Sequence, residues 1–132
     1  MPNNLHSVLM IRPSSFRHNH ETAKNNYYQK ILDDLSPEQT QDKALSEFHA
    51  FVDILKEKGI NVIVIKDTKN PDTPDSIFPN NWVSFHESGN IAIYPMCAKN
   101  RRDERREDIL DILVDNYNFE INYIKDFTEF ED

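Results

Sequence analysis

The stretch Trp82–Tyr94, which reads WVSFHESGNIAIY, decides the expected fold. Two short runs rich in aromatic and β-branched residues, 82–86 and 90–94, flank the turn-forming sequence Glu87-Ser88-Gly89. This pattern predicts a β-hairpin, in which Gly89 supplies the positive φ that the turn requires.

The sequence after this hairpin predicts a helix and then another strand. Apolar residues recur at helical spacing over residues 102–116, and residues 119–124 have the composition of a strand. Residues 81–124 therefore predict a ββαβ unit. The tail, 126–132, has no helix stop and no evident strand partner, and it looks cut off. The apolar face expected on the helix consists of Ile109, Leu110, Leu113 and Tyr117.

The first half of the chain predicts two strands separated by a long helix. Residues 7–11 and 61–65 are short apolar runs, and a proline at position 13 stops the first of them. The polar stretch between position 14 and the helix reads as an ordered loop with one helical turn, and residues 67–74 read as a second loop. This order of elements favours an α/β domain.

The long helix has clear start and stop signals. Ser36-Pro37-Glu38-Gln39 combines an N-cap, a first-turn proline and a capping-box glutamine. Gly59 supplies the C-terminal cap, so the helix is expected over 37–58. Its expected apolar stripe consists of Leu45, Phe48, Val52 and Leu55.

Composition excludes several classes of protein. The 132 residues suit one domain, 1–132, and the net charge of -8 argues against binding to nucleic acid. With two glycines there is no glycine-rich phosphate loop, and with one cysteine no intrachain disulfide and no cysteine pair for zinc. No run approaches the roughly 20 apolar residues of a membrane span. We therefore expect a soluble, cytoplasmic protein that needs no cofactor, no metal and no membrane.

Two segments carry the candidate site. Asp75–Trp82 (DSIFPNNW) places Phe78, Asn80 and Asn81 at a strand start, and the basic segment 99–106 follows about twenty residues later. One hairpin could fold the amides back onto the guanidinium groups, and together they could hold a small zwitterion. The competing interpretations are structural. The asparagines would form Asx turns, and Asp103, Glu104 and Glu107 would pair with Arg101, Arg102, Arg105 and Arg106.

The single cysteine and three of the histidines are weaker candidates for functional residues. Cys97 lies near basic residues, which could lower its thiol pKa, although a buried, inert thiol is the commoner case. His18 and His20 form a His-x-His pair without an evident third ligand, so surface histidines are expected rather than a metal site. His86 is expected to end a strand and to have no catalytic role.

Three ordered blocks of sequence resemble the arginine deiminase and amidinotransferase superfamily, and in particular its citrulline-utilisation hydrolase branch. The most distinctive block is Thr73–Trp82, TPDSIFPNNW. The first block consists of Met10-Ile11-Arg12-Pro13, Phe16, Asn19, Thr22-Ala23, Asn26 and Gln29. The third consists of Tyr94-Pro95-Met96, Ala98 and Asn100–Arg106.

The resemblance implies an α/β propeller (a pentein-like fold) of five ββαβ modules, of which about two would be present. It implies catalysis by a cysteine nucleophile and a histidine on a ureido or guanidino carbon. Phe78 and Asn81 fall where that family orients its substrate, Asn80 lies between them, and Arg101, or less favourably Arg102, falls where the substrate α-carboxylate is held. An amide at position 81, where relatives often have aspartate, would suit a neutral ureido group.

The resemblance also implies that the chain is an N-terminal portion, because members run to roughly twice this length with the catalytic histidine and cysteine later on. We therefore expect a truncated amidinotransferase-type hydrolase of arginine metabolism. It would bind citrulline or an arginine-like molecule and have no activity alone. The alternative is a non-catalytic remnant that acts as a binding module or forms a homo-oligomer through an exposed sheet edge.

Overall fold

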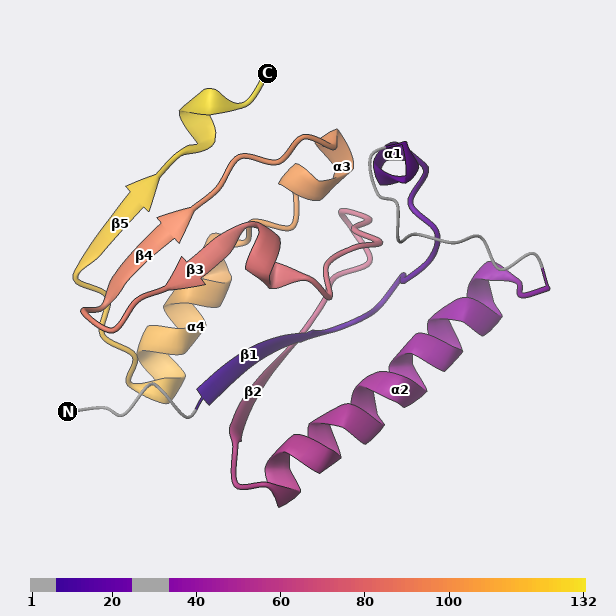
Figure 1. Ribbon diagram of the computed structural model, residues 1–132, viewed down its shortest axis with the longest axis horizontal. Helices are drawn as coiled ribbons and strands as arrows, with labels where there is room; N and C mark the ends of the chain where they lie inside the picture. Colours follow the sequence, from indigo (N-terminus) through magenta and orange to yellow (C-terminus); the bar gives the residue numbers. More distant parts are fainter. Residues whose placement is uncertain (1–6, 25–33) are drawn as a thin grey trace.

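The computed structural model describes residues 7–24 and 34–132, and they form two small sheets with helices packed beside them (Figure 1). In the first sheet, β1 (Ser7–Arg12) and β2 (Asn61–Lys66) pair in parallel, with Ser7 opposite Asn61 and Arg12 opposite Lys66. The crossover between them contains α2 (Pro37–Glu57), which lies along this sheet. The predicted strands and long helix are confirmed to within one residue at each end.

The start and end of α2 follow the predicted capping chemistry. Ser36 Oγ accepts a hydrogen bond from the Gln39 amide at 3.1 Å, and Gln39 Oε1 accepts one from the Ser36 amide at 2.9 Å. Gly59 then follows the C-cap with φ of +83°, which favours glycine. Of the predicted apolar stripe, Val52 is buried, whereas the neighbouring Phe51 remains 53% exposed.

The second sheet has the predicted ββαβ connectivity. β3 (Val83–Phe85) and β4 (Asn90–Ile93) form the antiparallel hairpin, and β5 (Tyr123–Asp126) pairs in parallel with β4. Gly89 has φ of +76°, and a Cβ at this position would lie 2.9 Å from the Glu120 carbonyl oxygen. The turn therefore requires glycine for both its conformation and its close approach to the returning chain.

The predicted helix over 102–116 is wrong at its start. The structure has a one-turn helix, α3 (Lys99–Arg102), then a break, and then α4 (Glu107–Tyr117). The break allows the Glu104 side chain to enter the protein interior, where it is 3% exposed. With the helix restarting at Glu107 and Asp108, acidic residues rather than arginines occupy its first turn, as the helix dipole favours.

The predicted strand over 119–124 is also displaced, because β5 begins only at Tyr123. The chain leaves α4 through Asn118 in the left-handed conformation (φ 53°), and Phe119 then packs edge-on against Phe85, with their ring centroids 5.4 Å apart. The Asn122 amide donates to the Gly89 carbonyl at 2.9 Å, and strand pairing starts at the next residue. Packing against the hairpin thus decides where this strand begins.

The C-terminal tail has partners, contrary to the sequence expectation. Asp126 lies opposite Ile93, residues Thr128–Phe130 form a 3-10 turn, and Glu131 accepts hydrogen bonds from Arg105. Strand partners and arginine pairs of this kind come from distant sequence, so the tail itself carries no signal of them.

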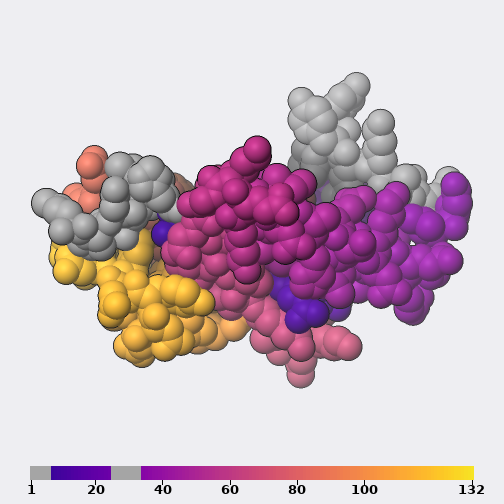
Figure 2. Space-filling view, turned by 90° about the horizontal axis from the view of Figure 1, so that it is seen from below, coloured from indigo at the N-terminus to yellow at the C-terminus, as the bar shows by residue number. Residues whose placement is uncertain are grey.

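One hydrophobic core joins the two sheets to α4. It combines buried residues of β1 and β2 with those of the second sheet and of α4, and Trp82 is its largest fully buried side chain. Seen from below, residues of α2 cover the right part of the molecule and C-terminal residues cover the left (Figure 2). The buried residues of this core are Ile11, Ile63, Ile65, Trp82, Val83, Ile91, Met96, Ile109, Leu110 and Leu113.

The predicted turn of helix after β1 is α1 (His20–Ala23), capped by Asn19. Residues 25–33 of that predicted loop, which include Asn26 and Gln29 of the first sequence block, lie outside the described residues. Within the described residues, no helix has both the length and the apolar character needed to cross a membrane.

Candidate functional site

Two buried carboxylates organise the loops that surround the candidate site. Asp67 follows β2 directly, is 5% exposed, and accepts hydrogen bonds from Thr73 Oγ1 at 3.0 Å and Ser76 Oγ at 2.7 Å. The Asp67 amide donates to the Arg12 carbonyl at 2.9 Å. The loop 67–78 is therefore folded around a carboxylate whose partners are hydroxyl groups.

Asp75, the second buried carboxylate, ties this loop to α1. Its Oδ2 accepts hydrogen bonds from Asn19 Nδ2 at 2.8 Å and from Thr22 Oγ1 at 3.2 Å. Asn19 and Asn100 exchange side-chain amide hydrogen bonds at 2.9 and 3.1 Å, and Glu21 Oε2 accepts from the Asn100 amide at 3.0 Å. These contacts hold α3 beside α1, as Figure 1 shows.

Arg101 occupies the centre of this arrangement, on α3. Its Nε and Nη2 donate to the two carboxylate oxygens of Glu104, each at 3.0 Å. Its Nη1 donates to Asn81 Oδ1 at 3.2 Å, and its Nη2 also donates to the Asp75 carbonyl at 3.4 Å. The predicted approach of the amide cluster to an arginine twenty residues later is therefore present in the structure.

Glu104 is a buried acid whose pKa is raised above its usual value. Burial raises the pKa of Glu104 to about 7, against the opposing effect of its hydrogen bonds and ion pair with Arg101. The negative charges of Asp75 and Asp67 also raise this pKa. Sequence reasoning treated Glu104 only as a candidate surface partner of the arginines, and its i, i+3 spacing from Arg101 gave no sign of burial.

Asn81 and Arg101 line one polar cleft with a volume of about 440 Å³. It lies between α1, the start of the hairpin and the segment that leads into α3. Cys97 is exposed at this cleft, contrary to the expectation of a buried thiol. The lining residues are Glu21, Thr22, Asn81, Pro95, Met96, Cys97, Ala98 and Arg101.

The remaining predicted site residues lie elsewhere. Phe78 is 44% exposed and lines a separate apolar groove, Asn80 is exposed, and neither contributes to the polar cleft. Arg102 donates from Nε to the Met96 carbonyl at 2.9 Å and from Nη2 to the Asp132 carbonyl at 3.0 Å. The structure thus brings together two of the five predicted residues.

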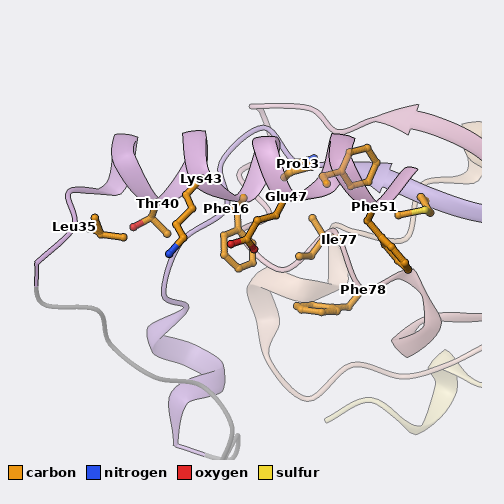
Figure 3. Close-up of a pocket in the computed structure, with 12 residues that line it drawn as sticks. Pro13, Phe16, Leu35, Thr40, Lys43, Glu47, Phe51, Ile77 and Phe78 are labelled. Carbon is orange, nitrogen blue, oxygen red and sulfur yellow. The ribbon is translucent and has the colours of Figure 1, made fainter. Parts of the chain in front are cut away.

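The apolar groove has a volume of about 520 Å³ and lies between α2 and the loop before the hairpin (Figure 3). Phe51 from the helix and Ile77 and Phe78 from the loop line it, with Lys43 and Glu47 along the helix side. It offers few polar groups, and in this respect it differs from the cleft at Arg101.

The competing structural interpretation of the arginines is correct in part. Arg105 pairs with Glu131 and Arg106 with Asp108, so carboxylates other than the expected Asp103 and Glu107 bind them. The predicted partner Glu104 does bind Arg101, but this pair is buried rather than at the surface.

The histidines contribute no metal site among the described residues, in which no group of three or more histidine, cysteine or acidic side chains is placed to hold an ion. His86 lies 2.9 Å from Ser84 Oγ through Nε2, on the hairpin. No histidine lines the polar cleft in the part of the chain that the structure describes.

Comparison with known proteins identifies a family for this chain. A family model described as N,N dimethylarginine dimethylhydrolase, eukaryotic, matches residues 12–132. The match supports the arginine-modifying amidinotransferase superfamily as the class of this protein. Because it spans most of the sequence, the chain belongs to the dimethylarginine dimethylhydrolase family. Comparisons with curated proteins and with solved structures give no match. The citrulline-utilisation branch and the number of propeller modules stay predictions.

Proposed function

We propose that this chain forms the ligand-orienting part of a hydrolase that acts on the ureido or guanidino group of an arginine derivative. The observation that supports this most directly is the shared cleft, in which Arg101 donates to Asn81 Oδ1 at 3.2 Å. In this proposal Arg101 binds the α-carboxylate of the ligand, and Asn81 binds its terminal group.

The orientation of Asn81 favours a ureido group, as in citrulline, over a guanidinium. An arginine side chain has only hydrogen-bond donors, so the Asn81 atom that faces Arg101 must be the amide oxygen. The Nδ2 group, which has no partner among the described residues, then offers its two donors to the ligand. A ureido oxygen accepts such hydrogen bonds, whereas a guanidinium has no acceptor.

The proposed contribution is binding and orientation rather than bond cleavage. Cys97 is exposed at the cleft, but none of the described residues that line the cleft is a histidine that could act as general acid and base. The family's cysteine nucleophile and its histidine are therefore not assigned to the described residues of this site.

Titration of L-citrulline and of asymmetric dimethylarginine into the ¹⁵N-labelled protein tests this proposal. The amide resonances of Asn81 and Arg101 are expected to shift, with tighter binding of citrulline. The isosteric variant Asn81→Asp replaces the amide donor with a carboxylate, and it should change the citrulline to dimethylarginine affinity ratio by about tenfold in favour of the guanidinium, the equivalent of one charge-assisted hydrogen bond. If neither ligand shifts these resonances at millimolar concentration, the proposed function is wrong.

A second candidate function is self-association through β5, one of the two outer strands of the described β3–β4–β5 sheet. All four β5 residues are exposed, including Tyr123 at 58% and Ile124 at 43%, and the nearby Phe130 is 69% exposed. An outer strand with exposed apolar side chains can pair with another chain. Sedimentation velocity should show a concentration-dependent dimer that Ile124→Lys disrupts, and a monomer at high concentration would rule this candidate out.

A further inference from the structure

All but one of the N–H groups of the Arg101 guanidinium donate hydrogen bonds to protein acceptors. Glu104 binds the edge formed by Nε and Nη2, the Asp75 carbonyl takes the second Nη2 hydrogen, and Asn81 takes one hydrogen of Nη1. An arginine side chain has five N–H donors, so a single Nη1 donor remains without a partner among the described residues. Glu104 therefore fixes which edge of the guanidinium faces the cleft.

The charges around Arg101 oppose an anionic ligand as long as the acids are ionised. Asp75 Oδ2 lies 3.9 Å from Arg101 Nε, and Glu104 binds the guanidinium directly. Asp67 acts electrostatically on Glu104 from the loop after β2, and Glu21 of α1 lines the same cleft. With Asp75 and Glu104 both ionised, two negative charges face one positive charge, before a ligand carboxylate adds a third.

We propose that a ligand carboxylate binds Arg101 together with a proton that Glu104 takes up from solvent. Glu104 is then a positioning residue, which holds the guanidinium in the empty site and becomes neutral in the occupied one. This inference rests on the proposed function, because it takes the ligand to be an amino acid with a free α-carboxylate.

Glu104 differs from the other buried acids of this cluster in its hydrogen-bond partners. Asp75 accepts hydrogen bonds from the side chains of Asn19 and Thr22, and Asp67 accepts them from those of Thr73 and Ser76. In the described residues, the Glu104 carboxylate receives hydrogen bonds from Arg101 alone, and its side chain has no solvent exposure. Burial raises its pKa to about 7, so proton uptake near neutral pH is inexpensive.

The test measures L-citrulline affinity from pH 6 to pH 8 by calorimetry, a range in which the carboxylate of citrulline keeps its charge. Affinity is expected to fall by up to about tenfold from pH 6 to pH 8, which is the limit for one group that titrates near pH 7 in the empty site. At pH 8, the binding enthalpy in phosphate and in Tris buffer should differ as expected for uptake of about one proton.

The matched variant is Glu104→Gln, which keeps the shape and one acceptor but cannot titrate. Its affinity for citrulline should not vary with pH. N-(4-aminobutyl)urea, which lacks the carboxylate and keeps the ammonium group, should not lose affinity for the wild-type protein between pH 6 and pH 8. Citrulline binding that does not vary with pH and takes up no proton in the wild-type protein would overturn this inference and leave the proposed function intact. If neither citrulline nor asymmetric dimethylarginine binds at any pH, both are overturned. The buffer comparison requires no variant, so it decides the question even if Glu104→Gln does not fold.

Discussion

Replacement of Arg101 by methionine should destabilise the protein by about 3–5 kcal/mol at pH 8, the typical cost of removing one partner of a buried ion pair. The Glu104 side chain has no solvent exposure, and within the described residues Arg101 is the donor to both of its oxygens. Without the guanidinium, the ionised carboxylate would remain buried and unpaired. Denaturant unfolding monitored by circular dichroism measures this loss directly.

The loss should be clearly smaller at pH 6. The pKa of Glu104 is raised to about 7 in the folded protein, above the usual value of 4.5, so the folded state binds more protons than the unfolded state over this range. Stability from this group is therefore present at low pH and decreases as pH rises through the folded pKa. Removing Arg101 raises the folded pKa further, and at pH 6 the carboxyl is neutral.

Arg102→Met provides the matched control for this prediction. Arg102 is next in sequence, yet its hydrogen bonds go to the carbonyls of Met96 and Asp132, and its ion pair with Glu131 is at 3.5 Å. Its replacement should cost about 1 kcal/mol with little change between pH 6 and pH 8. Equal losses for Arg101→Met at both pH values would contradict the assignment of the raised pKa to Glu104.

The sequence predicts those parts of the fold that depend on local signals. The Ser36 capping box and Gly59 delimit α2, and the Gly89 turn places the hairpin, because each of these depends on residues within one or two turns of the chain. The position of β5 depends instead on the Asn122 to Gly89 hydrogen bond and on the packing of Phe119 against Phe85. Such contacts between distant residues leave no period in the sequence, and for this reason the strand was predicted four residues too early.

The candidate site also has some features that the sequence predicts and others that it does not. Asn81 and Arg101 are joined by a hairpin, so their sequence separation predicted their proximity. Phe78 belongs to a loop in which side-chain direction has no period, and it faces the groove along α2 instead (Figure 3). The burial of Glu104 could not be predicted, because an acid three residues after an arginine is normally an exposed helical pair.

Replacement of Trp82 by alanine should cost about 3–5 kcal/mol, as expected for truncation of a large aromatic side chain in a packed core. Trp82 is 1% exposed and belongs to the cluster that includes residues of β1, β2, β4 and α4. Its backbone also joins the loop to the hairpin, with the Trp82 amide bound to the Pro79 carbonyl and its carbonyl bound to the Tyr94 amide. Thermal and denaturant unfolding measure the loss of stability.

Because Asn81 directly precedes Trp82, substitutions of Trp82 also test whether the core holds Asn81 in place at the cleft. Trp82→Phe retains most of the apolar volume and should lower the free energy of unfolding less than Trp82→Ala does. The control is Tyr123→Ala, at a side chain that is 58% exposed, which should change stability by less than about 0.5 kcal/mol. Where Trp82→Phe remains folded, a loss of the Asn81 resonance shift on citrulline addition would show that the core holds the amide in place. An unchanged shift would mean that the Asn81 to Arg101 hydrogen bond fixes this position without Trp82.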